Sequence, residues 1–146
     1  MSRLTDIPIR IEPLVSSSSG GLGGGVTAIL TEIVRLLERL ASLDEPAAID
    51  LRSLPMSPQD RTELQNALGE GEVQATLNAE GISRIHETRV PGVWWVEHRD
   101  RHGEPIAELI EVSRVPQILA SASEEIAAGA RDLRERITAA MAARSR

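Results

Sequence analysis

The chain has 146 residues, a length that suits one domain with a single hydrophobic core. Its formal net charge is −6 and every cation is an Arg, which disfavours a nucleic-acid binder, because phosphate contacts need concentrated positive charge. The absence of Cys excludes disulfides, a thiol nucleophile and thiolate sites for zinc or iron–sulfur clusters. No run of apolar residues approaches the length of a membrane span, and no unbroken apolar signal core occurs. We therefore expect a soluble cytoplasmic protein without a membrane partner.

Residues 1–25 are predicted to be an extended arm followed by a flexible Ser/Gly-rich linker, leaving residues 26–146 as the single folded domain. The glycines that precede Thr27 resemble a nucleotide-binding loop. However, Val26 stands where such a loop has its phosphate-binding Lys, and the chain has no Lys elsewhere. We expect no nucleotide and, more generally, no cofactor.

The folded part should begin with a helix over residues 27–43, because its apolar residues recur at helical spacing. A short strand could follow at residues 49–51. Ser57 has the features of an N-cap, with Pro58 at the first helical position of a short helix that ends near Leu68. Gly69 is expected to stop that helix in the left-handed conformation.

Four strands are predicted next, at residues 72–79, 82–90, 93–99 and 105–112. Their short connections imply an antiparallel meander, because parallel strands need long crossovers. A last helix, capped by Ser123, carries a stripe of apolar residues, namely Ile126, Ala130, Leu133, Ile137 and Met141. The predicted fold class is α+β, with an antiparallel four-stranded meander sheet packed with two long helices and one short helix.

The three histidines, His86, His98 and His102, are the only soft metal donors. His98 and His102 straddle a predicted hairpin, so their four-residue spacing is not the ligand spacing of a helix. The sequence also has no Gly-x-Ser-x-Gly elbow, and no spacing singles out an acid–base pair of carboxylates. We therefore predict no metal site, no catalytic residue and no enzyme activity.

Trp94 and Trp95 are the only aromatic residues and should lie in one strand, where neighbours point to opposite faces. Trp94 shares its face with Val96, so it is expected in the core. Trp95 shares its face with Glu97 and Arg99, and is expected on the polar or helix-free face of the sheet. Two readings of Trp95 stay open: packing under the N-terminal arm or a helix, or a contact with a partner protein made with Glu97 and Arg99.

Three segments in order have an unusual composition: AIDLRSLPMSPQDR from Ala48, LGEGEV from Leu68 and VPGVWWV from Val90. Together they resemble the HupH/HyaF family of hydrogenase expression proteins, over about the last two thirds of the chain. The residues that carry the resemblance, to which we give a structural role, are Asp50, Leu51, Leu54, Pro55, Gly69, Gly71, Gly92 and Trp94.

The resemblance implies a chaperone-like accessory protein for [NiFe] hydrogenase maturation. Its implied partners are a hydrogenase precursor, above all the iron–sulfur small subunit, and other hydrogenase accessory proteins. Longer family members carry two copies of this unit, whereas this chain holds one, so a homodimer could recreate the pair. The alternatives are a homodimeric interaction module without a hydrogenase client and a small-molecule-binding domain.

Overall fold

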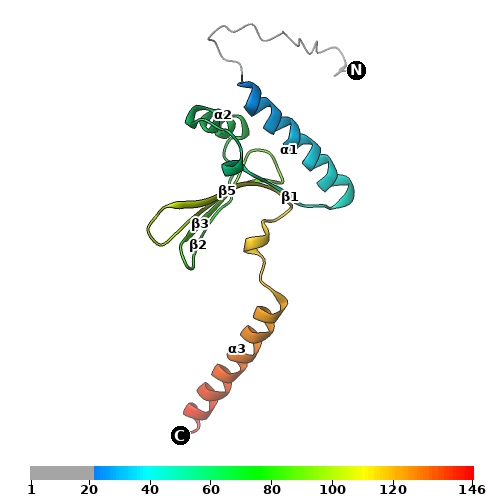
Figure 1. Ribbon diagram of the computed structural model, residues 1–146. Helices are drawn as coiled ribbons and strands as arrows, with labels where there is room; N and C mark the ends of the chain where they lie inside the picture. Colours follow the sequence, from blue (N-terminus) through cyan, green and yellow to red (C-terminus); the bar gives the residue numbers. More distant parts are fainter. Residues whose placement is uncertain (1–21) are drawn as a thin grey trace.

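The computed structural model describes residues 22–146, so the predicted arm and most of the predicted linker lie outside the described residues. The described chain has three α-helices and a five-stranded antiparallel sheet. The elements are α1 Gly24–Leu43, β1 Ala47–Asp50, η2 Leu51–Ser53, α2 Pro58–Leu68, β2 Gln74–Asn78, β3 Ile82–Glu87, β4 Val93–Arg99, β5 Pro105–Val112, η3 Gln117–Leu119 and α3 Ser123–Arg144. Figure 1 shows α1 and α2 on one side of the sheet, whereas α3 extends away from it.

The first helix begins at Gly24, three residues before its predicted start, so Gly24 and Gly25 are helical and not part of a linker. Tertiary contacts explain the earlier start. Val26 is fully buried in the first turn, and the backbone N–H of Gly23 donates to Glu63 Oε2 of α2 at 3.1 Å. The sequence prediction relied on the Gly-rich composition, which by itself indicates a flexible segment.

The sheet confirms the α+β class but corrects the predicted number of strands from four to five. Strands β2 to β5 form the predicted meander, and β1 adds a fifth strand beside β5, in the order β1-β5-β4-β3-β2. Ala47 pairs with Val112 and Asp50 with Leu109. The sequence suggested a short strand at residues 49–51, and β1 overlaps it at Ala47–Asp50. Its place in the sheet was not predicted, because its partner strand lies about sixty residues away in the sequence.

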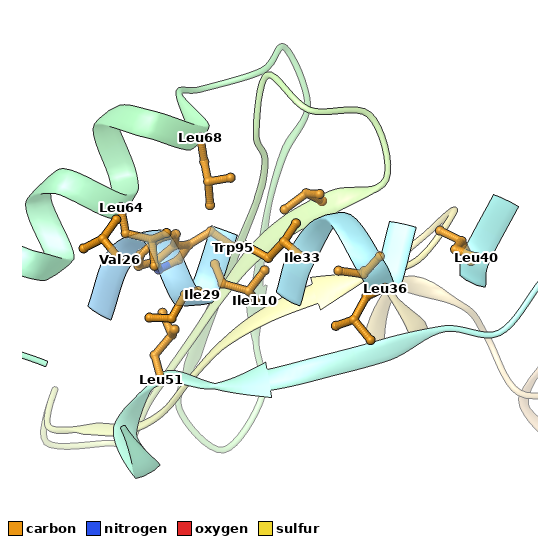
Figure 2. Packing of buried hydrophobic residues seen from close by; sticks show 12 residues of the cluster. Val26, Ile29, Ile33, Leu36, Leu40, Leu51, Leu64, Leu68, Trp95 and Ile110 are labelled. Atoms are coloured by element: carbon orange, nitrogen blue, oxygen red, sulfur yellow. The ribbon is translucent and has the colours of Figure 1, made fainter. Parts of the chain in front are cut away.

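The main core lies between α1, α2 and the covered face of the sheet. Figure 2 shows Trp95 among side chains of α1, α2 and β5. Trp95 belongs to the same buried cluster as the apolar stripe of α1. The buried members of this cluster are Val26, Ile29, Ile33, Leu36, Leu40, Leu51, Leu64, Leu68, Val93, Trp95, Ile110 and Val112. The predicted amphipathic stripe of α1 is thus confirmed as the element that covers the sheet.

The opposite face of the sheet has a smaller cluster of its own. Ile85, Trp94 and Val96 are buried there, and Leu119 of η3 packs against them. Trp94 is 7% exposed, and its indole N–H donates to the carbonyl oxygen of Ser113 at 3.0 Å. The prediction that Trp94 is buried is confirmed.

The prediction that Trp95 lies on the helix-free face is wrong, because Trp95 is 2% exposed and lies under the helices. The alternation along β4 correctly placed Trp94 and Trp95 on opposite faces. It does not say which face the helices cover, and the charged neighbours of Trp95 suggested the wrong one. Those charges lie farther along β4, toward its C-terminal end.

The last helix was predicted to pack with the sheet, and this is also wrong. No residue of α3 is buried, and the helix extends away from the sheet (Figure 1). The N-cap is Ala122 instead of Ser123, and its backbone N–H donates to Glu125 Oε2 at 3.1 Å. An amphipathic pattern predicts that a helix needs an apolar partner, but it does not say that the partner lies in the same domain. None of the helices in residues 22–146 combines the length and apolar character of a membrane span.

Both tryptophans should be needed for stability. We expect Trp95→Ala to lower the free energy of unfolding by about 3–5 kcal/mol, the range for large aromatic deletions in cores, and Trp94→Ala to have a similar effect. Denaturant unfolding of both variants measures this. A loss below about 1 kcal/mol for Trp95→Ala would contradict its position in the main core.

Candidate interaction site

A hydrogen-bond network anchors Trp95 beneath α2. The indole N–H of Trp95 donates to Glu108 Oε1 at 3.1 Å, and Arg61 Nη2 of α2 lies 3.1 Å from Glu108 Oε2. The Glu108 side chain is buried, so its charge requires these partners. The network joins β4, β5 and α2, and therefore fixes how the short helix sits on the sheet.

The role of Glu108 as a buried, paired carboxylate was not predicted, although the pattern along β5 indicates it. Along β5, Ile110 and Val112 share a face with Glu108, so a carboxylate interrupts an apolar face. A charged residue at such a position is rarely buried without a partner. Which residue supplies the partner could not be read from the sequence, because Arg61 lies 47 positions away.

A cleft lies directly outside this network, between the C-terminal end of α2 and β3. Its volume is about 360 Å³, and it is lined by Gln65, Asn66, Gly69, Glu70, His86, Arg89 and Trp95. The His86 ring is stacked on Trp95, with ring centroids 6.3 Å apart and planes 10° from parallel. Around the stacked rings, the cleft offers a carboxylate (Glu70), a guanidinium (Arg89) and two side-chain amides. Such a lining suits recognition of a polar side chain or peptide segment.

Glu97 and Arg99 lie farther along the same sheet face. They are half-buried and ion-paired to each other, and Arg99 Nη1 donates to the carbonyl oxygen of Gly103 at 2.9 Å. Glu97 is the cross-strand neighbour of both Arg84 and Glu108. Of the three residues predicted to contact a partner, Trp95 is therefore interior, and only Glu97 and Arg99 reach the surface.

Two glycines of the LGEGEV segment shape the loop beside the cleft, and Gly69 lines the cleft itself. Gly69 has φ 66° and ψ −174°, an extended conformation with positive φ that essentially only Gly adopts, and not the left-handed one that was predicted. A Cβ at Gly69 would lie 2.7 Å from Cδ of Arg89, and one at Gly71 would lie 2.7 Å from the carbonyl oxygen of Thr88. The glycines thus let the loop pass close to the end of β3, and Glu70 between them is exposed.

The other residues that carry the resemblance lie at a helix start, in the core, beside a cavity and in a turn. Asp50 Oδ1 accepts from the Arg52 N–H at 3.0 Å at the start of η2, and Leu51 is buried in the main core. Leu54 packs against that core, and Pro55 lines a separate apolar cavity of about 220 Å³ beside α1. Gly92 has φ 85° in the turn before β4.

The histidines do not converge. His86 lines the cleft, His98 Nδ1 lies 2.7 Å from Ser83 Oγ on the opposite face, and His102 is exposed in the β4–β5 turn. Between residues 22 and 146, no three His, Asp or Glu side chains are grouped closely enough to hold a metal ion. The three histidines therefore lie in separate parts of the domain.

Comparison with known proteins decides the family. The family model described as "HupH hydrogenase expression protein, C-terminal conserved region" matches residues 25–140, which include every helix and strand described above apart from the ends of α1 and α3. The chain belongs to this family. The resemblance found in the sequence motifs is therefore confirmed.

The relatives agree with this assignment. Over 109 residues, the chain is 37% identical to the hydrogenase expression/formation protein HoxQ of Azotobacter vinelandii, covering 73% of this chain and 38% of that protein. It is 34% identical to HupH of Rhizobium leguminosarum bv. viciae over 68% of this chain and 36% of that protein. The chain thus spans little more than a third of the length of these relatives. Their names describe hydrogenase expression or formation, so the family is one of accessory proteins and not of enzymes.

A solved structure supports the fold. The hydrogenase expression protein HupH from Thiobacillus denitrificans ATCC 25259 superposes with a TM-score of 0.75 at 39% sequence identity. The match covers 80% of this chain and 97% of that one.

The buried network can be tested through Glu108. We expect Glu108→Ala to lower the free energy of unfolding by about 1–3 kcal/mol, because the Trp95 N–H loses its acceptor in a buried site. Glu80→Ala is the matched control, since the Glu80 side chain is almost fully exposed, and should change it by less than about 0.5 kcal/mol. Equal denaturation midpoints for the two variants would show that the network does not stabilise the domain.

The glycine of the cleft wall gives a second test. Gly69→Ala should cost about 1–3 kcal/mol through its positive φ and the clash with Arg89. Gly129→Ala in α3 meets no atom within 4 Å and should be neutral or favour the helix, because Gly is a poor helix former. Thermal unfolding measures the first effect and helicity by circular dichroism the second. A Gly69→Ala variant as stable as the wild type would contradict the strained loop.

Proposed function

We propose that this chain is a protein-binding module in the maturation of a [NiFe] hydrogenase, acting on a hydrogenase precursor in the cytoplasm. One observation carries the proposal: the family match covers the folded unit from α1 into α3, and relatives named for hydrogenase expression match 73% and 68% of the chain. The cleft beside His86 supports a binding role, because it provides recognition groups without a nucleophile–base arrangement.

The proposed client is the precursor of the iron–sulfur small subunit, as the motif resemblance implies. A chain without Cys has no thiolates with which to hold iron–sulfur clusters, so its role toward such a subunit is that of a chaperone. Binding is expected to need no metal. Other hydrogenase accessory proteins are further proposed partners.

The proposed contact surface is the part of the sheet face that α1 and α2 leave uncovered. It contains Arg84, Glu97 and Arg99, and it continues into the cleft at His86. This surface keeps two of the three residues that the sequence suggested. Trp95 supports this surface from the core. Its buried ring stacks with His86, and its hydrogen bond to Glu108 helps to fix the position of α2. Trp95 is only 2% exposed and reaches the solvent only where it lines the cleft, so we do not include it in the surface.

Two other functions have some support in the structure. A homodimeric interaction module is favoured by the exposed apolar stripe of α3. A small-molecule site is favoured only by the volume of the cleft, which lies near the lower limit for ligand pockets. Its lining is more polar than is usual for such pockets, so recognition of a protein segment fits better.

The proposal is tested by a pull-down of the small- and large-subunit precursors from a hydrogenase-producing cell. The variant exchanges Glu97→Arg and Arg99→Glu together, which preserves the ion pair within the chain but inverts the charges presented to a partner. We expect it to recover at least about tenfold less small-subunit precursor than the wild type, a change of about 1.4 kcal/mol in binding free energy.

The matched control exchanges Glu32→Arg and Arg35→Glu, an exposed ion pair on α1 with a 2.9 Å separation. This control should recover the client like the wild type. Recovery of neither subunit by the wild type would contradict the proposed function. Equal loss in both exchanged variants would instead remove the sheet face as the contact surface, and loss of binding on addition of a chelator would contradict the metal-independent contact.

A further inference from the structure

The last helix presents an apolar surface that nothing in residues 22–146 covers. Its four large apolar side chains are between 52% and 65% exposed. They are Ile126, Leu133, Ile137 and Met141. With Ala130, they recur at spacings of four, three, four and four residues, so they form one stripe along the helix.

Such a helix gains little stability from its own domain. Isolated helices in water are marginal even at favourable length, and most helical stability comes from packing of the apolar face. The family match extends to residue 140, so most of this stripe belongs to the unit that the family shares. A partner for the stripe is therefore expected, and we propose that it is the α3 of a second copy of this chain, in an antiparallel helix pair. This inference does not depend on the hydrogenase client.

The distribution of charge along α3 argues for a second copy and for the antiparallel direction. The first turn contains Glu124 and Glu125, and the C-terminal end contains Arg144 and, just beyond it, Arg146. An antiparallel pair places the acidic end of each helix beside the basic end of the other, and it also opposes the two helix dipoles favourably. A parallel pair would place like charges together at both ends.

The stripe is also symmetric enough to pair with itself in this direction. When Leu133 lies near the twofold axis, Ile126 comes opposite the partner's Met141, and Ala130 comes opposite the partner's Ile137. The first contact joins two large apolar side chains and the second joins a small one to a large one, and each is made twice. An isologous contact of this kind closes after two copies and does not extend into a filament.

The expected dimer is weak and reversible. A helix of 22 residues is about 33 Å long, and with a footprint about 10 Å wide it covers roughly 300–400 Å² of its partner. Stable complexes bury about 800 Å² per partner. We therefore expect association in the micromolar range or weaker.

The first experiment is sedimentation velocity of the full chain across a concentration series. We expect a concentration-dependent monomer–dimer equilibrium, with at least a tenfold weaker association for Leu133→Glu. Ala139→Glu is the matched control, because it adds the same charge to the same helix away from the stripe, and it should dimerise like the wild type. Tryptophan fluorescence of both variants should stay native, since Trp94 and Trp95 are buried in the two core clusters, to which α3 contributes no residue.

A second experiment tests the direction of the helices and uses the absence of Cys in the chain. Leu133→Cys should cross-link to itself, whereas Ile126→Cys should cross-link to Met141→Cys in a mixture and not to itself. Efficient cross-linking of Ile126→Cys to itself would overturn the antiparallel arrangement. A monomer at all concentrations, or a dimer equally weakened by Ala139→Glu, would overturn the α3 pair, even if the hydrogenase client were recovered as proposed.

Discussion

The packing of Trp95 between the sheet and the two covering helices sets most of the structure around it. Its ring lies in the main core beneath α1 and α2, where it packs with the apolar side chains of α1. Its indole N–H also needs a hydrogen-bond partner at that depth, and Glu108 supplies one. The carboxylate in turn requires a cation, which Arg61 brings from α2. One buried ring therefore constrains two strands and a helix.

This constraint connects the core to the proposed binding surface. The outer side of the Trp95 ring carries the stacked His86, so the floor of the cleft is part of the core. The opposite wall comes from the loop after α2, where Gly69 and Gly71 allow the chain to approach β3 closely. Two of the residues that carry the family resemblance, Gly69 and Gly71, thus help to shape the surface at the cleft. This is consistent with an accessory protein whose relatives are named for hydrogenase expression and formation.

The apolar stripes of α1 and α3 differ in whether the domain covers them. The stripe of α1 is buried by the sheet of its own domain, whereas the stripe of α3 stays exposed. Both helices carry an apolar stripe, but they differ in how they connect to the sheet. A short connection of residues 44–46 returns the chain from α1 to β1, but residues 113–122 lead it away from the sheet before α3 begins. The pairing of α3 with a second copy would give this second stripe the apolar partner that the domain does not provide.

The sequence by itself determined the local structure and the family of this protein. The Ser57–Pro58 helix start, the end of α2 at Leu68 and the bounds of β4 and β5 follow from local signals that act over a few residues. Only the tertiary structure decided which face of the sheet the helices cover, that β1 joins as a fifth strand, that Glu108 meets Arg61 and Trp95, and that α3 stays uncovered. Strand alternation and helical periodicity define two faces of an element but do not distinguish them when both carry apolar residues. Which face is covered depends on contacts between residues far apart in the chain. Local sequence patterns carry no information about the energies of these contacts.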